Sequence, residues 1–132
     1  MTVENHASED TMFTLGNMLF EYNNEKNRIN IAKHGISFKN AARVFFDYDR
    51  IELYDEDNSE NEDRYDTIGD LSAGIPANAI GNMGYSNTDD IVFVVYTEKL
   101  RRDVNGQFIE VTRLISARMA TNFERGLYYG KY

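Results

Sequence analysis

The sequence predicts an α+β fold in which three helices pack on a mostly antiparallel sheet of four to five strands. Three observations lead to this fold class. Apolar residues recur at helical spacing between residues 24 and 46, and with a period of two from residue 50 onward. The dipeptide Asn105–Gly106 is a strong hairpin signal between two apolar runs. Because strands joined by short turns run antiparallel, the helices are expected to cover one face of the sheet.

The first helix is predicted from its capping residues. Asn23 or Asn24 caps a helix that runs to about residue 33, and Gly35 is expected to end it in a left-handed conformation. Ile29 and Ala32 lie on one side, where they are expected to pack. The spacing i, i+4, i+7, i+8 places on one polar stripe Lys26, Asn30, Lys33 and His34.

Two further helices are predicted from their N-caps. Ser37 caps a helix that has an apolar side at the spacing i, i+3, i+4, i+7. That side is formed by Phe38, Ala41, Ala42 and Phe45. Thr121 and Glu124 form a capping box for a last helix that ends near Tyr129.

Five segments are expected to form strands: Leu19–Tyr22, Arg50–Tyr54, Arg64–Leu71, Ile91–Glu98 and Phe108–Ala117. The fourth is a continuous apolar run, which is typical of a central strand. Asp55–Asp63 is expected to be a solvated acidic loop, and Ser72–Asp90, which holds the single proline, a long loop. Residues 1–18 lack periodicity, so we expect a flexible N-terminal extension of one domain over residues 19–132.

The composition excludes several kinds of site. Without cysteine there is no disulfide, thiolate metal site or cysteine nucleophile, and with only His6 and His34 a histidine-rich metal centre is excluded. No metal or other cofactor is expected. The first residues lack the regions of a signal peptide, and no apolar stretch is long enough to span a membrane. We therefore expect a cytoplasmic protein with no membrane partner.

Charge is distributed unevenly along the chain, which has a net charge of −8. Residues 44–90 hold two basic and thirteen acidic residues, whereas residues 91–132 hold seven basic and four acidic ones. Two basic segments, Asn24–Arg43 and Arg113–Arg125, therefore flank an acidic middle. For binding to a polyanion such as RNA, the distribution of charge along the chain matters more than the net charge.

Cleavage of RNA by its own 2′-OH needs a base, an acid and cations around the phosphorane, but no metal. Candidates for these roles are Lys26, Lys33, His34, Arg64, Arg113, Arg118, Arg125, Tyr128 and Tyr129. Structural alternatives stay open for several of them. His34 is also suited to the C-terminal end of a helix, and the two tyrosines to a core or an interface. Arg113 and Arg118 are also suited to ion pairs with the many acids.

Four ordered blocks of the chain resemble the BrnT toxin family. The opening block, Phe20–Asp47, matches the family pattern at Phe20, Glu21, Tyr22, Lys26, Asn30, Lys33, His34, Gly35, Ile36, Ser37 and Phe38. The resemblance continues through Glu62–Gly69, Val92–Glu98 and Arg113–Tyr129. Together the blocks span about residues 19–129.

This resemblance implies the toxin of a type II toxin–antitoxin system, with a RelE-like fold. Such toxins are metal-independent endoribonucleases that arrest translation. The implied partner is a BrnA-like ribbon-helix-helix antitoxin, and the toxin would contact DNA only indirectly, through this antitoxin. The resemblance leaves open whether the protein forms a homodimer or a hetero-oligomer. The implied catalytic residues are His34, Lys33, Arg64, Arg113 and Arg118. RNA binding is expected from Lys26, Asn30, Arg125 and Tyr128, with Glu98 as an alternative to His34 for proton transfer.

The chain departs from the family pattern at three points. Loop insertions are expected near residues 72–90 and 99–108, and Asn23 stands where the family has Asp. The acidity of the chain lowers the expected non-specific affinity for RNA, which depends on neutralised phosphates. The alternative function is therefore a catalytically inactive BrnT-like module that only complexes an antitoxin and modulates its DNA binding.

Overall fold

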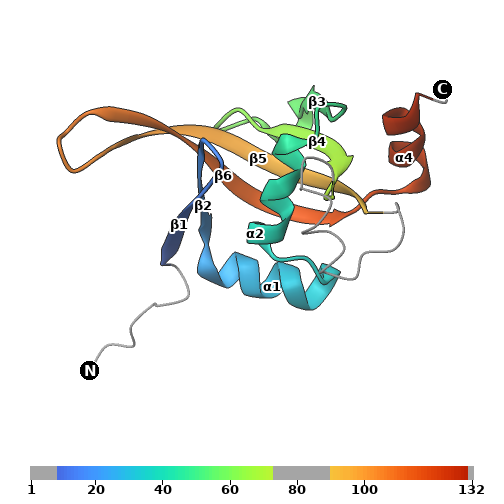
Figure 1. The fold of residues 1–132 in the computed structure, drawn as a ribbon, viewed down its shortest axis with the longest axis horizontal. Helices are drawn as coiled ribbons and strands as arrows, with labels where there is room; N and C mark the ends of the chain where they lie inside the picture. The colour runs from blue at the N-terminus through green and yellow to red at the C-terminus, as the bar shows by residue number, and fades with distance from the viewer. Residues whose placement is uncertain (1–8, 73–89, 131–132) are drawn as a thin grey trace.

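A computed structural model describes residues 9–72 and 90–130 of the chain (Figure 1). The six-stranded mixed sheet has the order β1-β2-β6-β5-β4-β3. Its strands are β1 (Asp10–Leu15), β2 (Met18–Asn23), β3 (Ile51–Tyr54), β4 (Tyr65–Asp70), β5 (Ile91–Arg102) and β6 (Phe108–Met119). The helices are α1 (Asn24–His34), α2 (Phe38–Ala41) and α4 (Asn122–Tyr129), with 3₁₀ turns η2 (Ala42–Phe46) and η3 (Glu56–Asn58). The predicted α+β class is thus confirmed, and residues 9–72 and 90–130 form three helices.

The predicted sheet lacked one strand. Residues 1–18 were expected to be an extension without regular structure, but Asp10–Leu15 forms β1 and pairs antiparallel with β2. The strand is stabilised from outside its own segment, because the ring of Phe13 stacks on that of Phe20 at 5.2 Å. Antiparallel pairing dominates as predicted, although β2 and β6 pair in parallel. Residues 1–8 lie outside the described part of the chain.

The insertion expected near residues 99–108 is mostly strand. β5 continues to Arg102 and β6 begins at Phe108, so the two strands form a long arm that projects beyond the rest of the sheet (Figure 1). The turn contains Asn105 and Gly106 as predicted, and Gly106 has a φ of 80°, which favours glycine. Most of the other insertion, residues 73–89, lies outside the described residues.

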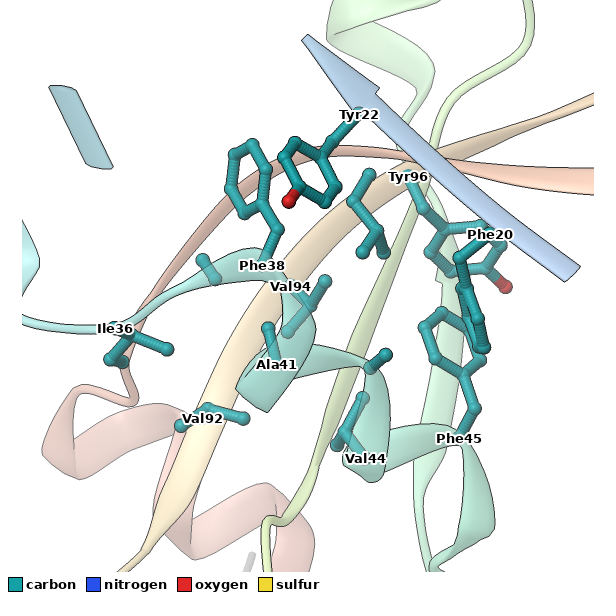
Figure 2. Close-up of a cluster of buried hydrophobic side chains, with 13 residues drawn as sticks. Phe20, Tyr22, Ile36, Phe38, Ala41, Val44, Phe45, Val92, Val94 and Tyr96 are labelled. Carbon is teal, nitrogen blue, oxygen red and sulfur yellow. The ribbon is translucent and has the colours of Figure 1, made fainter. Parts of the chain in front are cut away.

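The core lies between one face of the sheet and the segment α2–η2. Ser37 caps α2 as predicted, but the helix tightens into the 3₁₀ turn η2 after Ala41. In Figure 2, side chains of this segment face those of β2 and β5. Fully buried residues on the two sides include Phe20, Phe38, Ala41, Ala42, Val44, Val92 and Val94.

The predicted orientation of α1 is wrong. Asn23 caps the helix and Gly35 ends it as expected, but Ile29 is 47% exposed while Asn30 is buried. The reason lies in the neighbouring strand. β2 pairs with β6 only at Thr112 and Arg113, so the edge of β6 beyond these residues is left for α1 to cover. The backbone N–H and C=O groups at that edge of β6 need hydrogen-bond partners, which a polar side chain such as Asn30 provides and an apolar one does not.

The last helix, α4, begins with the predicted capping box of Thr121 and Glu124. In Figure 1, α4 lies at one end of the sheet. It is held there by polar contacts to β6 and to the segment after η2, including a hydrogen bond from Tyr128 to Asp47. None of the helices that the structure describes is long and apolar enough to cross a membrane.

Candidate active site

A groove of about 250 Å³ lies between α1 and β6. We call it the α1 groove. It is lined by Lys26, Ile29, Asn30, Lys33, His34, Ile115 and Ser116. The polar stripe predicted on α1 thus lines one surface. Within residues 9–72 and 90–130, the side chains of Lys26, Lys33 and His34 form no hydrogen bond or ion pair. These three groups are therefore available to a ligand.

Asn30 has a different role from the other groove residues. Its Nδ2 donates to the carbonyl oxygens of Ile36 at 2.9 Å and Ala117 at 2.8 Å. Its Oδ1 accepts the backbone N–H of Ala117 at 3.1 Å. The buried amide thus pairs with β6 as a neighbouring strand would. It fixes α1 against the sheet, and this engagement argues against the expected contact with RNA.

A β-bulge in β6 decides which side chains face the groove. Tyr96 pairs with Leu114 while Val95 pairs with Ser116, which leaves Ile115 as the extra residue. In a regular strand, residues five apart point to opposite faces. The bulge reverses the alternation, so Arg113, Ser116 and Arg118 share the face of the sheet that is not covered by α2. We call this the open face.

Arg113 lies in an ion-pair network on the open face. Its Nη1 donates to Glu21 Oε2 at 2.5 Å and to Asp10 Oδ2 at 2.8 Å, and Arg101 also binds Glu21. The Glu21 side chain is only 3% exposed. Burial raises the pKa of Glu21, but the hydrogen bonds and charges of the two arginines outweigh burial and hold that pKa below its usual value.

Arg64 belongs to the same side of the sheet. Glu62 forms ion pairs with Lys99 and, at 3.7 Å, with Arg64. The hydrogen bond from Lys99 lowers the pKa of Glu62 most, and the charges of Arg64 and Arg113 lower it further. The structure therefore brings Arg64 and Arg113 to the same region of the open face, where the charges of both act on the carboxylate of Glu62. Among the described contacts none links either arginine to His34.

Arg118 holds α4 to the sheet. Its Nη1 and Nη2 donate to the two oxygens of Glu124 at 2.8 and 2.9 Å, and its guanidinium lies 4.2 Å from the ring centre of Phe93. This ion pair raises the pKa of Arg118. The arrangement matches the alternative in which the arginine has an ion-pairing role.

Sequence reasoning missed Asp66, which lies on the open face between Leu53 and Val95. Burial, together with the neighbouring charge of Asp55, raises the pKa of Asp66 to about 6. The signal was present, because strand alternation in the predicted segment Arg64–Leu71 places Asp66 on the same face as Arg64.

Glu98 lies apart from these groups. The register partner of Arg113 is Thr97, so the next residue along β5 points to the opposite face. The charge of Glu98 acts instead on the tyrosines of the core side, where it contributes to the raised pKa values of Tyr65 and Tyr96. The structure thus separates Glu98 from the arginines that were predicted to share its site.

Two predicted RNA-binding residues lie on α4. Tyr128 donates its hydroxyl to Asp47 Oδ2 at 2.7 Å, and burial together with this bond raises the pKa of Tyr128. Asp47 is buried and also accepts the backbone N–H of Asp70 at 2.8 Å. Tyr128 therefore anchors α4, as its structural alternative requires. Arg125 lies half-buried on the same helix.

Cation ligands do not cluster in the described part of the chain. There, no group of three or more His, Cys, Asp or Glu residues is arranged to hold a metal ion.

The chain matches one known family over part of its length. The family model described as "Ribonuclease toxin, BrnT, of type II toxin-antitoxin system" matches residues 22–77, which confirms the resemblance over those residues. The matched segment includes Lys33, His34 and Arg64, whereas Arg113 and Arg118 lie beyond it. A comparison with curated proteins found no match.

Proposed function

Because residues 22–77 match the BrnT ribonuclease toxins, we propose that this protein is the toxin of a type II toxin–antitoxin system and cleaves RNA without a metal ion. One observation carries the catalytic part of the proposal. His34 and Lys33 of α1 line the groove together with Ser116 of β6. The side chain of Arg113, also on β6, lies on the same open face of the sheet as that of Ser116. A proton-transfer group, a cation and a phosphate-binding arginine thus border one surface.

In the proposed reaction the 2′-oxygen of RNA attacks the adjacent phosphorus, and the bond from phosphorus to the 5′-oxygen breaks. The products are a 2′,3′-cyclic phosphate and a 5′-hydroxyl. His34 transfers a proton between the 2′-hydroxyl and the leaving 5′-oxygen, because an imidazole can both accept and donate a proton and its ring lines the groove. Lys33 stabilises the charge that develops on the phosphate oxygens, and Arg113 binds the RNA backbone farther along β6. Asn30 holds α1 against β6 through its hydrogen bond to Ala117. The positive charge of Arg64 helps to keep Glu62 on the open face ionised by lowering its pKa.

The proposed partner is a BrnA-like ribbon-helix-helix antitoxin that covers the groove and contacts DNA for the complex. Support comes from α1, where Ile29 and Ile31 are 47% and 43% exposed. Ile29 lines the groove itself, so a partner that buried this apolar surface would also block access to His34. With RNA as substrate and loss of translation as the result, we propose that the toxin acts in the cytoplasm.

Expression in bacteria without an antitoxin tests this function. The wild type is expected to arrest growth, and His34→Ala combined with Arg64→Ala is expected to relieve the arrest. A matched control is Arg28→Ala, because Arg28 is exposed on α1 and pairs only with Glu25 among the described residues. Soluble wild-type protein that leaves growth unchanged would contradict the proposal.

A second candidate function is a catalytically inactive module that only binds an antitoxin and modulates its DNA binding. It is favoured by the ion pairs of the three predicted catalytic arginines. Arg64 pairs with Glu62, Arg113 with Glu21, and Arg118 with Glu124. This candidate predicts tight antitoxin binding and altered DNA binding of the complex, with no cleavage of RNA by the separated protein.

A further inference from the structure

The arm formed by β5 and β6 extends the open face beyond the predicted catalytic residues. The registers Thr97↔Arg113 and Arg101↔Ile109 place Arg101 on the same face as Arg113, and alternation along β5 adds Lys99. Arg102 follows directly in sequence and therefore points to the opposite face, where its guanidinium lies over the ring of Phe108. β5 thus contributes two cations to the open face of the arm, and β6 contributes their apolar register partners Val111 and Ile109.

Glu21 holds two of these cations in place. Its Oε1 accepts Arg101 Nε at 3.0 Å, and its Oε2 accepts Nη groups of both Arg101 and Arg113. The Glu21 side chain is 3% exposed, whereas those of Arg101 and Arg113 are 40% and 21% exposed. One buried carboxylate therefore orients two guanidiniums that still reach solvent. Arg101 uses two of its five N–H donors on Glu21, which leaves donors for a ligand.

Asp10 is the exposed member of the network. Its carboxylate binds Arg113, and its side chain is 40% exposed on the edge strand β1. An exposed ion pair contributes little to stability, so an incoming anion can replace Asp10 far more easily than it can replace Glu21. A phosphate that took this place would meet two oriented guanidiniums, and the planar fork of arginine suits phosphate oxygens.

We propose that Arg101 and Arg113, oriented by Glu21, form a second phosphate-binding subsite, which binds the RNA backbone after displacing Asp10. The subsite rests on the proposed function and deepens it. Because of the bulge at Ile115, Arg113 and Ser116 pair with Thr97 and Val95, which are two positions apart on β5, or roughly 7 Å at about 3.3 Å per residue. At ~3.4 Å per stacked nucleotide, the subsite contacts RNA about two nucleotides from the α1 groove.

The chemistry of the face favours RNA over a protein partner. Protein interfaces are enriched in aromatic and apolar residues at their centre. On the arm, the exposed apolar residues Leu100 and Phe108 belong to the opposite face, since they pair with Glu110 and Arg102 and alternate with Arg101. On the open face of the arm, the apolar register partners of Lys99 and Arg101 are the buried Val111 and the half-buried Ile109, so charged side chains make up most of what this face presents to solvent.

The test is the affinity of the full chain for a 2′-O-methyl RNA oligonucleotide, in which the nucleophile is blocked, over a series of salt concentrations. Arg101→Ala is expected to weaken binding about tenfold and to reduce the slope of log affinity against log salt by about 0.7, because one phosphate contact is lost. The matched control Arg102→Ala, from the opposite face, is expected to stay within about twofold of wild type. Equal effects of the two substitutions, or no effect of Arg101→Ala, would overturn the subsite.

Two more variants test the roles of the carboxylates. Asp10→Asn is expected to bind the same RNA about threefold more tightly, because the competing carboxylate is removed. Glu21→Gln is expected to weaken binding and reduce the salt slope, with partial rescue in Glu21→Asp. A loss of affinity in Glu21→Gln with an unchanged salt slope would indicate a merely structural role and contradict the positioning. Thermal melting of each variant checks folding, and Arg101→Gln keeps the packing of the side-chain stem if Arg101→Ala is unstable.

The outcomes separate this inference from the proposed function. Wild type that neither binds nor cleaves RNA overturns both. Wild type that cleaves an unmodified RNA, while Arg101→Ala binds 2′-O-methyl RNA as tightly as wild type, overturns the subsite alone. If Arg101→Ala weakens binding of the antitoxin and leaves RNA binding unchanged, the face serves a protein partner and the subsite is again refuted.

Discussion

Replacement of Asn30 tests how α1 is attached to the sheet. Its amide makes three hydrogen bonds to backbone groups of Ile36 and Ala117, and the residue is 6% exposed. Asn30→Leu keeps the size of the side chain but leaves three backbone groups without a partner. At about 1–3 kcal/mol for each buried unsatisfied group, with partial relaxation, we expect a loss of about 4 kcal/mol in the free energy of unfolding. Urea denaturation at pH 7 measures this loss.

Asn30→Asp adds a dependence on pH with a defined sign. The carboxylate can still accept the N–H of Ala117 but faces two carbonyl oxygens that it cannot serve as a donor. The ionised form is therefore disfavoured in the folded state, and the pKa of the new carboxyl is raised. Stability relative to wild type is lowest at neutral pH and recovers as the pH falls through that raised pKa.

The control for both variants is Asn40→Asp, because Asn40 is exposed on α2. We expect it to change the free energy of unfolding by less than about 0.5 kcal/mol. Asn30→Asp with a stability at pH 7 within about 1 kcal/mol of wild type would refute the double-donor role of Asn30.

Three further substitutions have defined outcomes. Arg118→Ala is expected to release α4 from the sheet, because the hydrogen bonds to Glu124 and the contact with Phe93 are lost. Limited proteolysis should then cut the variant first near residue 120, and a cleavage pattern like that of the wild type would argue against this anchor. Glu21→Gln is expected to destabilise the protein at pH 7, and the difference should shrink as pH falls below about 4.5, since the lowered pKa of Glu21 stabilises the fold only while the carboxyl is ionised. Asp66→Asn is expected to stabilise the protein at pH 7, because a pKa of about 6 means that ionisation is disfavoured in the folded state. That gain should vanish below about pH 4 in urea titrations at several pH values, and a gain that did not depend on pH would contradict it.

The sequence predicted those features that depend on neighbouring residues. Asn23, Ser37 and Thr121 cap their helices because each side chain accepts a hydrogen bond from the backbone N–H three residues later. The turn at Gly106 follows from local backbone preference in the same way. Strand β1 was missed because its half-polar segment becomes a strand only by packing against β2, through contacts such as that of Phe13 with Phe20.

The candidate site was predictable as a set of residues but not as an arrangement. Lys26, Lys33 and His34 do line one groove, as their spacing on α1 indicated. The extra residue Ile115, which brings Arg113 and Arg118 to one face, shows in the sequence only as the apolar pair Leu114–Ile115, which interrupts the alternation. The burial of Asn30 depends on the uncovered edge of β6, which only the tertiary structure defines.

The most direct test of the proposed function is analysis of the RNA ends produced by purified, antitoxin-free protein in the presence of EDTA. The proposal predicts 2′,3′-cyclic phosphate and 5′-hydroxyl ends, no cleavage where the 2′-OH is replaced by hydrogen, and a loss of at least about a hundredfold in rate for His34→Ala. Cleavage that required a divalent cation, that left 5′-phosphate ends, or that persisted at the wild-type rate in His34→Ala would contradict it.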